Sequence, residues 1–216
     1  MNSTGRRLLL AISMASLVAM GSPAAGEEAR AETDKPITAE TLQAVKEGGY
    51  VIYMRHSLSD LSTHDQLPLV NLEDCSSQRN LTAEGRLRAA DIGKAIKRLR
   101  IPVGEVLASP YCRTRETAEQ AFGKALASHA LLNTANLTDQ EKAPIVAELR
   151  TLLGRPVPPG SNRVLVSHSS TLSDATGIFP KPQGVVLVFR PDGNGSFRHV
   201  ATIAPTDWEK IGSPRR

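Results

Sequence analysis

The sequence predicts an α/β protein, a three-layer α/β/α sandwich built on a mostly parallel sheet with an antiparallel edge. Two observations lead to this fold class. Short apolar strands alternate with helical patterns over residues 38–177, which is the order of elements in a parallel sheet. The last two strands instead flank the turn DGNG at 192–195, which is typical of a hairpin and makes the final pair antiparallel.

The first elements are a short helix and a strand. TAETLQAVKEGG begins at Thr38, a good N-cap residue, and stops at a Gly-Gly pair, so it predicts a helix. The apolar run YVIYM follows at once and leads into Arg55 and His56. The polar connection 57–80 is long for a compact domain, and loops of that length are usually functional or disordered.

A longer helix and a second strand come next. TAEGRLRAADIGKAIKRLR, residues 82–100, starts at a Thr82 cap and stops before Pro102. Its apolar residues fall broadly on one face, which we expect to be buried: Leu87, Ala90, Ile92, Ala95, Ile96 and Leu99. VGEVLAS is then a short apolar strand that runs into Ser109.

The second half of the chain completes the alternation. CRTRETAEQAFG predicts a helix closed by Gly123, and PIVAELRTLLG predicts another that ends at Gly154. Much of the segment 124–145 fits no single pattern. After the proline-rich loop RPVPPGSN, RVLVSHSS is a third strand that ends on His168, and TLSDATG is a short helix. VVLVFRPDGNGSFRHVATI supplies the final hairpin.

The N-terminus is typical of an export signal. Arg6 and Arg7 precede the apolar run LLLAISMASLVAM, and the small residues of GSPAAG offer cleavage sites. We expect a signal peptide at 1–26, a linker at 27–37 and one domain at 38–216, in the periplasm or secreted. The alternative is an uncleaved N-terminal anchor, which also places the domain outside the cytoplasm.

Charge and composition exclude some partners. The formal net charge of +4 falls to +2 without residues 1–26, because that segment holds two arginines and no acids. A nearly neutral chain gives little support for nucleic acid, which needs a clustered basic face, so we expect no such partner. No second long apolar run follows, so we expect no transmembrane segment in the mature chain. The oligomeric state stays open.

The two cysteines, Cys75 and Cys112, have three interpretations. A disulfide can persist in an exported chain. The alternatives are two buried free thiols or a pair of metal ligands. Neither cysteine has the CxxC or CxxH spacing of a metal site, which disfavours the last interpretation.

Large polar side chains follow three of the predicted strands. Arg55 and His56 end the first, Arg113 follows the second, and His168 ends the third. Ligands of open α/β sheets bind beyond the carboxyl ends of the strands, so these side chains should converge. Histidines and arginines around one point suit an anion such as a phosphoryl group, because guanidinium forks match its oxygens. Arg115 is expected to be a helix-surface charge.

Four separate motifs resemble the histidine phosphatase superfamily, which has a phosphoglycerate mutase-like fold. They are RH at 55–56, QRNLTAEG at 78–85, SPxxR with a following TA at 109–118, and the strand-ending His168. The resemblance covers roughly residues 48–204. With the predicted signal peptide, the chain looks like an exported bacterial-type member.

The resemblance implies a covalent mechanism that needs no cofactor and no metal ion. His56 attacks phosphorus and becomes a phosphohistidine, which water then hydrolyses. Arg55, Arg113 and His168 stabilise the charge on the phosphoryl oxygens. Further contacts with the substrate are expected from residues next to these motifs: Ser57, Arg79, Asn80 and Ser169.

Two departures from the family's pattern concern catalysis. Many members have glycine after the RH pair, whereas this chain has Ser57, which adds a side chain where the backbone approaches the nucleophile. Relatives often place a glutamate after the second motif, or an aspartate after the second histidine, to protonate the leaving group. Here two serines follow His168. The candidate donors are Glu141 and Glu148, with Asp60, Asp74 and Asp139 as further possibilities.

We therefore expect an exported, metal-independent phosphomonoesterase that acts on a small or saccharide-linked phosphate ester. The alternative is a non-catalytic module that keeps the arginine-histidine pocket to bind phosphate or another anion. Ser57 and the missing acid motivate that alternative. A metallohydrolase that uses the five histidines is a third hypothesis.

Overall fold

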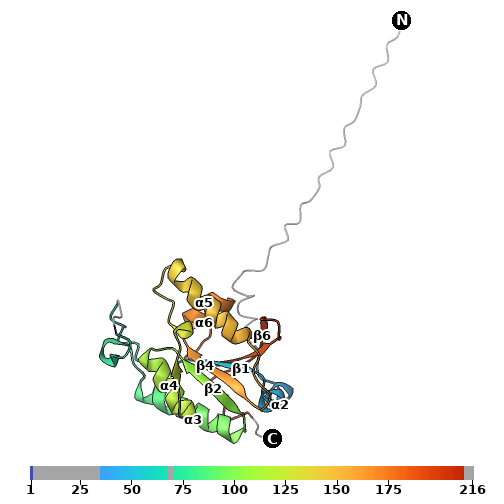
Figure 1. The fold of residues 1–216 in the computed structure, drawn as a ribbon, viewed down its shortest axis with the longest axis horizontal. Coiled ribbons are helices and arrows are strands. Elements are labelled where there is room, and N and C mark those ends of the chain that lie inside the picture. Colours follow the sequence, from blue (N-terminus) through green and yellow to red (C-terminus); the bar gives the residue numbers. More distant parts are fainter. Residues whose placement is uncertain (2–34, 68–70, 212–216) are drawn as a thin grey trace.

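The protein is described from a computed structural model, which covers residues 35–67 and 71–211 together with Met1 (Figure 1). The predicted signal peptide at 1–26 and most of the predicted linker lie outside the described residues. In the described part of the chain, no helix combines the length and the apolar character that a membrane span needs.

A six-stranded sheet forms the centre of the described chain. The strands lie in the order β3-β2-β4-β1-β5-β6. β3, β2, β4 and β1 are parallel, whereas β5 is antiparallel to both β1 and β6. The mostly parallel sheet with an antiparallel edge is therefore confirmed. Its strands are β1 (Val51–Arg55), β2 (Val103–Ala108), β3 (Leu126–Ala127), β4 (Asn162–Ser167), β5 (Val186–Pro191) and β6 (Phe197–Ile203).

Helices cover both faces of the sheet, which gives the three predicted layers (Figure 1). α2 (Ala39–Glu47), α3 (Ala83–Arg98) and α4 (Cys112–Phe122) pack on one face. α5 (Asp139–Gly154) and α6 (Ser169–Thr176) pack on the other. Two short 3-10 turns complete the described elements, η1 (Cys75–Ser77) and η2 (His129–Leu131).

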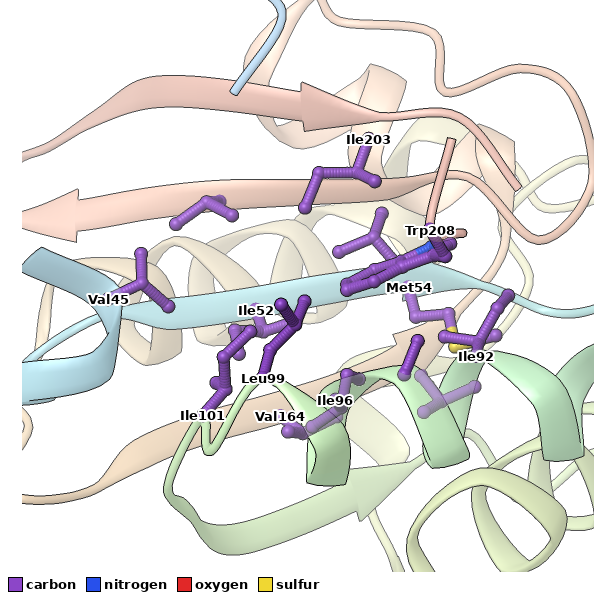
Figure 2. Packing of buried hydrophobic residues seen from close by; sticks show 14 of the residues in the cluster. Val45, Ile52, Met54, Ile92, Ile96, Leu99, Ile101, Val164, Ile203 and Trp208 are labelled. Atoms are coloured by element: carbon purple, nitrogen blue, oxygen red, sulfur yellow. The ribbon is translucent and has the colours of Figure 1, made fainter. Parts of the chain in front are cut away.

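The central strand β1 separates two hydrophobic cores. Ile52 and Met54 pack into the core beneath α2 and α3, and Figure 2 shows Met54 there near Trp208. Val51 and Tyr53 point to the opposite face and pack into the core beneath α5 and α6. Successive side chains of a strand alternate between the two faces. The first four residues of β1 are therefore apolar because both faces of the strand are covered there.

The face of α3 differs in part from the prediction. Leu87 is 67% exposed and Ala90 is only half-buried, whereas Ala89 and Gly93 are buried. The reason is the helical spacing, which places Leu87 on the exposed stripe of charged residues. On the buried face α3 packs closely on α4, since a Cβ at Gly93 would lie 2.1 Å from the carbonyl oxygen of Ala121.

Several element boundaries also differ. α5 begins at Asp139, in the segment that fits no pattern, because Thr138 and Glu141 form a capping box at its start. α6 begins at Ser169, directly after His168, rather than at Thr171. At the end of the predicted linker, the carbonyl oxygen of Lys35 accepts a hydrogen bond from the backbone N–H of Thr202 in β6.

One long connection separates β1 from α3. We call residues 57–80 the β1–α3 loop. Within it, η1 is the only regular element among the described residues.

Candidate active site

Three strand ends meet at one edge of the sheet, as the sequence predicts. The parallel register pairs Arg55 at the end of β1 with Ser167 at the end of β4. Beyond the strands, the N–H of His56 donates to the carbonyl oxygen of Ser167, and the N–H of Ser109 donates to that of Val166, both at 2.9 Å. The residues that follow β1, β2 and β4 are therefore held side by side.

His56 is buried, and its ring is fixed by the adjacent backbone. Nδ1 lies 2.9 Å from the carbonyl oxygen of Ser57. A carbonyl only accepts, so Nδ1 carries the hydrogen and Nε2 carries the lone pair. Burial, with the positive charge of Arg113 adding to it, lowers the pKa of His56 well below its usual range. The imidazole is therefore neutral near neutral pH, with Nε2 as its nucleophilic atom.

His168 lies beside His56, with the two ring centroids 5.6 Å apart. Its Nδ1 is 3.5 Å from Nη2 of Arg113, and its Nε2 is 2.9 Å from Oγ of Ser109. A guanidinium only donates, so Nδ1 accepts and Nε2–H donates to the serine. Burial first, and then the charge of Arg113, lowers the pKa of His168 well below its usual range. This second imidazole is therefore also neutral.

Three arginines surround the two histidines. Arg113 comes from α4 and is fully buried, Arg55 ends β1, and Arg79 comes from the β1–α3 loop. Burial lowers the pKa of Arg55, Arg113 and both histidines, and the charge of Arg79 lowers each of them further. Each arginine has a buried Nε–H without a hydrogen-bond partner among the described residues. Buried donors normally have partners, so this cluster is suited to an anion.

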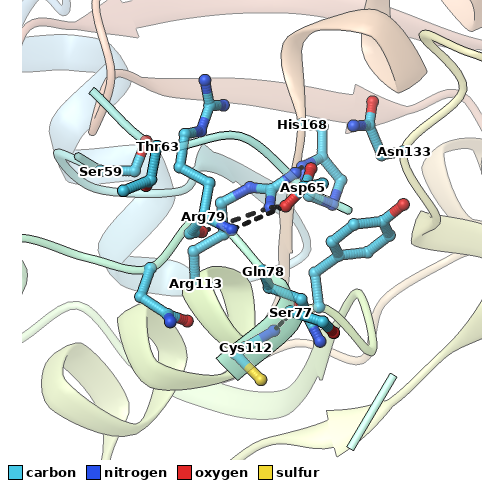
Figure 3. A network of polar contacts seen from close by, with 12 residues as sticks. Ser59, Thr63, Asp65, Ser77, Gln78, Arg79, Cys112, Arg113, Asn133 and His168 are labelled. Carbon is cyan, nitrogen blue, oxygen red and sulfur yellow. Dashed lines mark hydrogen bonds and ion pairs between the residues drawn. The ribbon is translucent and has the colours of Figure 1, made fainter. Parts of the chain in front are cut away.

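One carboxylate, that of Asp65, contacts the cluster. Its Oδ1 lies 2.9 Å from Nη1 of Arg113 and accepts a hydrogen bond from the backbone N–H of Arg79, also at 2.9 Å (Figure 3). The Asp65 side chain is only 13% exposed. Three arginines, one carboxylate and two neutral histidines carry a formal charge of about +2, which complements a phosphoryl dianion.

Tyr111 forms an aromatic wall of the pocket. Its ring centroid lies 4.9 Å from that of His168, and Cζ of Arg113 lies 4.6 Å above its ring. An arginine over a tyrosine face is held by the ring quadrupole as well as by packing. Tyr111 therefore fixes both a histidine and an arginine of the cluster.

A disulfide between Cys75 and Cys112 ties the β1–α3 loop to the start of α4, so the disulfide interpretation is confirmed. Gln78 makes a second connection, because its Oε1 accepts a hydrogen bond from the backbone N–H of Cys112 at 2.9 Å. Arg79 follows Gln78, and Arg113 follows Cys112. The two connections therefore fix the loop arginine relative to the helix arginine.

Solved structures share this architecture. The structure of the protein histidine phosphatase SixA with tungstate aligns with a TM-score of 0.55 at 17% identity, over 73% of this chain and 98% of that one. The alpha-ribazole phosphatase of Shigella flexneri aligns with a TM-score of 0.53 at 13% identity, over 72% of this chain and 96% of that one. A mycobacterial glucosyl-3-phosphoglycerate phosphatase with inorganic phosphate aligns with a TM-score of 0.50 at 14% identity, over 73% of this chain and 96% of that one.

The chain has the histidine phosphatase fold. By sequence alone, it matches no family model and no curated protein. The phosphoglycerate mutase-like architecture expected from the four motifs is therefore confirmed by structure.

Ser57 follows the RH pair of this histidine phosphatase fold without backbone strain. Among the described residues, Arg100 is the only non-glycine residue with a positive φ, so Ser57 has an ordinary conformation. Its N–H donates to Oγ1 of Thr117 at 3.0 Å. Its Oγ is buried and has no hydrogen-bond partner in the described chain. The position therefore tolerates serine, and the hydroxyl adds a polar group next to His56.

Two of the residues predicted to contact the substrate, Asn80 and Ser169, make no contact with the arginines of the cluster among the described hydrogen bonds. Asn80 donates through Nδ2 to the carbonyl oxygen of Cys75, and it lines a separate hollow together with Arg86 and Arg115. Its amide therefore holds the loop. Ser169 is the first residue of α6 and is half-buried next to His168, and no hydrogen bond of its hydroxyl is recorded among the described residues.

The predicted proton donors do not join the cluster. Glu148 is exposed on α5, and no hydrogen bond or ion pair of the described pocket involves it. Glu141 caps α5, where hydrogen bonds from the backbone and then the hydroxyl of Thr138 lower its pKa. A carboxyl group held in its ionised form is a poor acid. Glu141 differs from the prediction because its carboxylate caps the N-terminus of α5.

Sequence reasoning missed Asp65 and Tyr111. Asp65 stands in LSTHDQ, a stretch without a motif, and only the length and polarity of the β1–α3 loop indicated a functional segment. Tyr111 occupies a variable position within SPYCR, between two motif residues. Its aromatic character at that place was the available signal.

The remaining histidines do not form a metal centre. His64 and His129 are exposed, and His199 lies on β6 with its Nε2 2.9 Å from the carbonyl oxygen of Ala201. In the part of the chain that the structure describes, no three His, Cys, Asp or Glu side chains are grouped so that they could hold a metal ion. This geometry argues against the metallohydrolase hypothesis.

Proposed function

We propose that the chain is a phosphomonoesterase that forms a phosphohistidine on His56. The observation that carries this proposal is the lone pair of Nε2, available because Nδ1 is committed to the carbonyl oxygen of Ser57, in a buried cluster of net positive charge. The fold supports it, because the solved structures with this fold include phosphatases, one with tungstate and one with inorganic phosphate. Export to the periplasm or the medium, from the predicted signal peptide, is part of the proposal.

The chemistry takes place in two displacements. Nε2 of His56 attacks phosphorus, and the bond from phosphorus to the ester oxygen breaks, with its electron pair passing to the departing alcohol. Water then attacks the phosphohistidine, the nitrogen–phosphorus bond breaks, and phosphate leaves. Arg55, Arg79 and Arg113 stabilise the phosphoryl oxygens in both steps, so no metal ion is needed for charge neutralisation. His168, whose two ring nitrogens contact Arg113 and Ser109, orients the guanidinium of Arg113.

The departing oxygen requires a proton, and we assign its donation to Asp65. Asp65 is the one carboxylate among the described residues that contacts the arginine cluster. A phosphoryl group bound at Arg113 lies beside this carboxyl group, so Asp65 is the residue placed to pass a proton to the alcohol oxygen as it leaves.

The test is hydrolysis of para-nitrophenyl phosphate by the full chain in the presence of a chelator. We expect turnover by the wild type, its loss in His56→Ala, and its retention in His129→Ala, because His129 is an exposed histidine outside the cluster. An alkaline quench during turnover should leave one phosphoryl group on the wild type, detected by intact mass, and none on His56→Ala. Activity that persists in His56→Ala would contradict the proposal.

The second candidate is a non-catalytic module that binds an anion in the same pocket. It is favoured by the pairing of Asp65 with Arg113, since a carboxylate already occupies one of the arginines. This candidate predicts saturable phosphate binding without hydrolysis of any ester. The same assay therefore separates the two candidates.

A further inference from the structure

An apolar hollow lies beside the arginine-histidine cluster, and Tyr111 contacts both. The hollow has a volume of about 530 Å³. Tyr111 lines it and at the same time contacts the ring of His168 and the guanidinium of Arg113. We call it the leucine hollow, because four leucines line it: Leu67, Leu72, Leu132 and Leu137.

The leucine hollow is of a size and character that suit a small ligand. Leu67 and Leu72 come from the β1–α3 loop, whereas Leu132 and Leu137 come from the connection between η2 and α5. Leu67 is 54% exposed, so its side chain is open to a ligand that enters the hollow. Small-molecule sites typically have volumes of roughly 300 to 1,000 Å³.

Both walls of the leucine hollow are attached to elements that carry the cluster. On one side, the carbonyl oxygen of Leu72 accepts a hydrogen bond from Nε2 of Gln78, whose Oε1 binds the backbone of Cys112. On the other side, Oδ1 of Asn133 accepts a hydrogen bond from Oγ of Ser170 at 2.7 Å. Figure 3 shows Asn133 in the same close view as His168. The hollow is therefore fixed in position relative to the phosphate pocket.

We propose that the leucine hollow binds the alcohol portion of the substrate, and that this portion is an alkyl chain or an aryl ring. The proposal rests on the proposed function for the phosphate pocket. A phosphoryl group bound at Arg113 lies next to Tyr111, because the guanidinium stacks on that ring, so the carbons that follow the ester oxygen meet the leucine side chains. A sugar is disfavoured, because the leucines and Tyr111 outnumber the polar lining residues Asn133, Asn136 and Glu141, so most of its hydroxyl groups would lose hydrogen bonds to water.

The charge of Glu141 at the leucine hollow narrows the class of substrate further. Glu141 is the one carboxylate that lines it, and Thr138 holds this carboxylate in its ionised form. An alcohol portion that carries a second carboxylate or phosphate would meet a like charge there. The substrate class is therefore an apolar monophosphate ester without a further acidic group.

The test measures the binding of n-alkylphosphonates, from methyl to octyl, to the full chain. Phosphonates keep the anionic head but have no ester bond to hydrolyse. We expect the affinity to rise roughly fourfold for each added methylene until the leucine hollow is filled. Glucose 6-phosphate, measured on His56→Ala to prevent turnover, should bind no better than methylphosphonate. Propylphosphonate should bind better than 3-phosphonopropionate, and Glu141→Gln should reduce that difference.

Matched leucine variants locate the effect. Leu67→Asn and Leu137→Asn should flatten the dependence on chain length and leave the affinity for methylphosphonate unchanged. Leu61→Asn is the control, because Leu61 is 70% exposed and does not line the hollow. Leu67 is itself exposed, so its replacement leaves the cores intact.

The outcomes separate this inference from the proposed function. A flat series in the wild type, a slope that neither variant changes, or tighter binding of glucose 6-phosphate than of octylphosphonate overturns the assignment of the leucine hollow. A rising series without hydrolysis of any alkyl phosphate overturns the proposed phosphatase activity and leaves the ligand class of the hollow in place. Hydrolysis together with a flat series overturns the hollow alone.

Discussion

The strand ends and the β1–α3 loop contribute to the pocket in different ways. Arg55, His56 and His168 are held by the ends of parallel strands, where ladder hydrogen bonds continue into the site. Asp65 and Arg79 come from a loop that a disulfide and Gln78 fasten to α4. In the proposed mechanism the sheet holds the nucleophile, and the loop holds the proton donor and one wall of the leucine hollow.

The largest expected effect concerns the strand-end group. His56→Ala should lower kcat/KM for para-nitrophenyl phosphate by roughly 10⁴-fold to 10⁶-fold, as expected when a nucleophile is removed. Binding of phosphate should be largely retained, because the arginines remain. The kinetic measurement is made beside phosphate binding by calorimetry. A loss of binding equal to the loss of rate would mean that His56 is a structural residue.

The next effect concerns the loop carboxylate. Asp65→Asn should lower kcat by roughly 10²-fold to 10⁴-fold for alkyl phosphates, whose alcohols need a proton to leave. It should have little effect on 2,4-dinitrophenyl phosphate, whose phenolate leaves without one. Glu148→Gln, an exposed carboxylate of α5, is the control and should change neither rate. An equal loss for both esters would exclude Asp65 as the proton donor.

Removal of the disulfide tests whether its link between the β1–α3 loop and α4 positions Asp65. The double variant Cys75→Ser/Cys112→Ser should lower the free energy of unfolding by about 3 to 4 kcal/mol, because the bridge closes a long loop of the unfolded chain. Denaturant titration measures this change. At a temperature where the variant stays folded, hydrolysis of alkyl phosphates should fall more than hydrolysis of 2,4-dinitrophenyl phosphate. An equal effect on both would show that the loop and the strand ends act as one unit.

The smallest effect is in proton linkage. Burial and the neighbouring arginines lower the pKa of His56 and His168, so both are neutral in the free protein at mildly acid pH. A bound dianion brings negative charge and raises these pKa values again. Binding of sulfate, which has no proton of its own to release in this range, should therefore take up protons, increasingly as the pH falls below the usual histidine range. Calorimetry in two buffers of different ionisation enthalpy measures the uptake, and proton release would contradict the assigned charges.

Local chemistry made the strand-end group predictable. β1 and β4 are short apolar runs, and parallel strands share one carboxyl edge, so the order of elements was enough to bring Arg55, His56 and His168 together. Helix starts were predicted where the cap residue was in place, as at Thr38 and Thr82. Leu87 was assigned to the wrong face because it lies on the exposed stripe with Asp91 and Lys94, and its apolar character was given more weight than its position on the helix.

The contacts of the β1–α3 loop with the cluster could not be predicted in the same way. Asp65 is separated from Arg113 by 48 positions in the chain, and nothing local connects the two. The disulfide was one of three interpretations of Cys75 and Cys112, since pairing depends on distance in space. Glu141 was a reasonable proton donor by residue type, but its carboxylate caps α5 and is therefore held away from the cluster.

The sequence by itself determined the fold class, the strand-end residues and the resemblance to the histidine phosphatases, because each depends on patterns within a few residues or on the order of elements. The tertiary structure decided which carboxylate meets Arg113, which cysteines pair, and that Tyr111 joins the phosphate pocket to the leucine hollow. These features depend on where a long loop comes to rest. Its position is set by contacts with α4, among them the disulfide and the hydrogen bond from Cys112 to Gln78, that lie far from it in the chain.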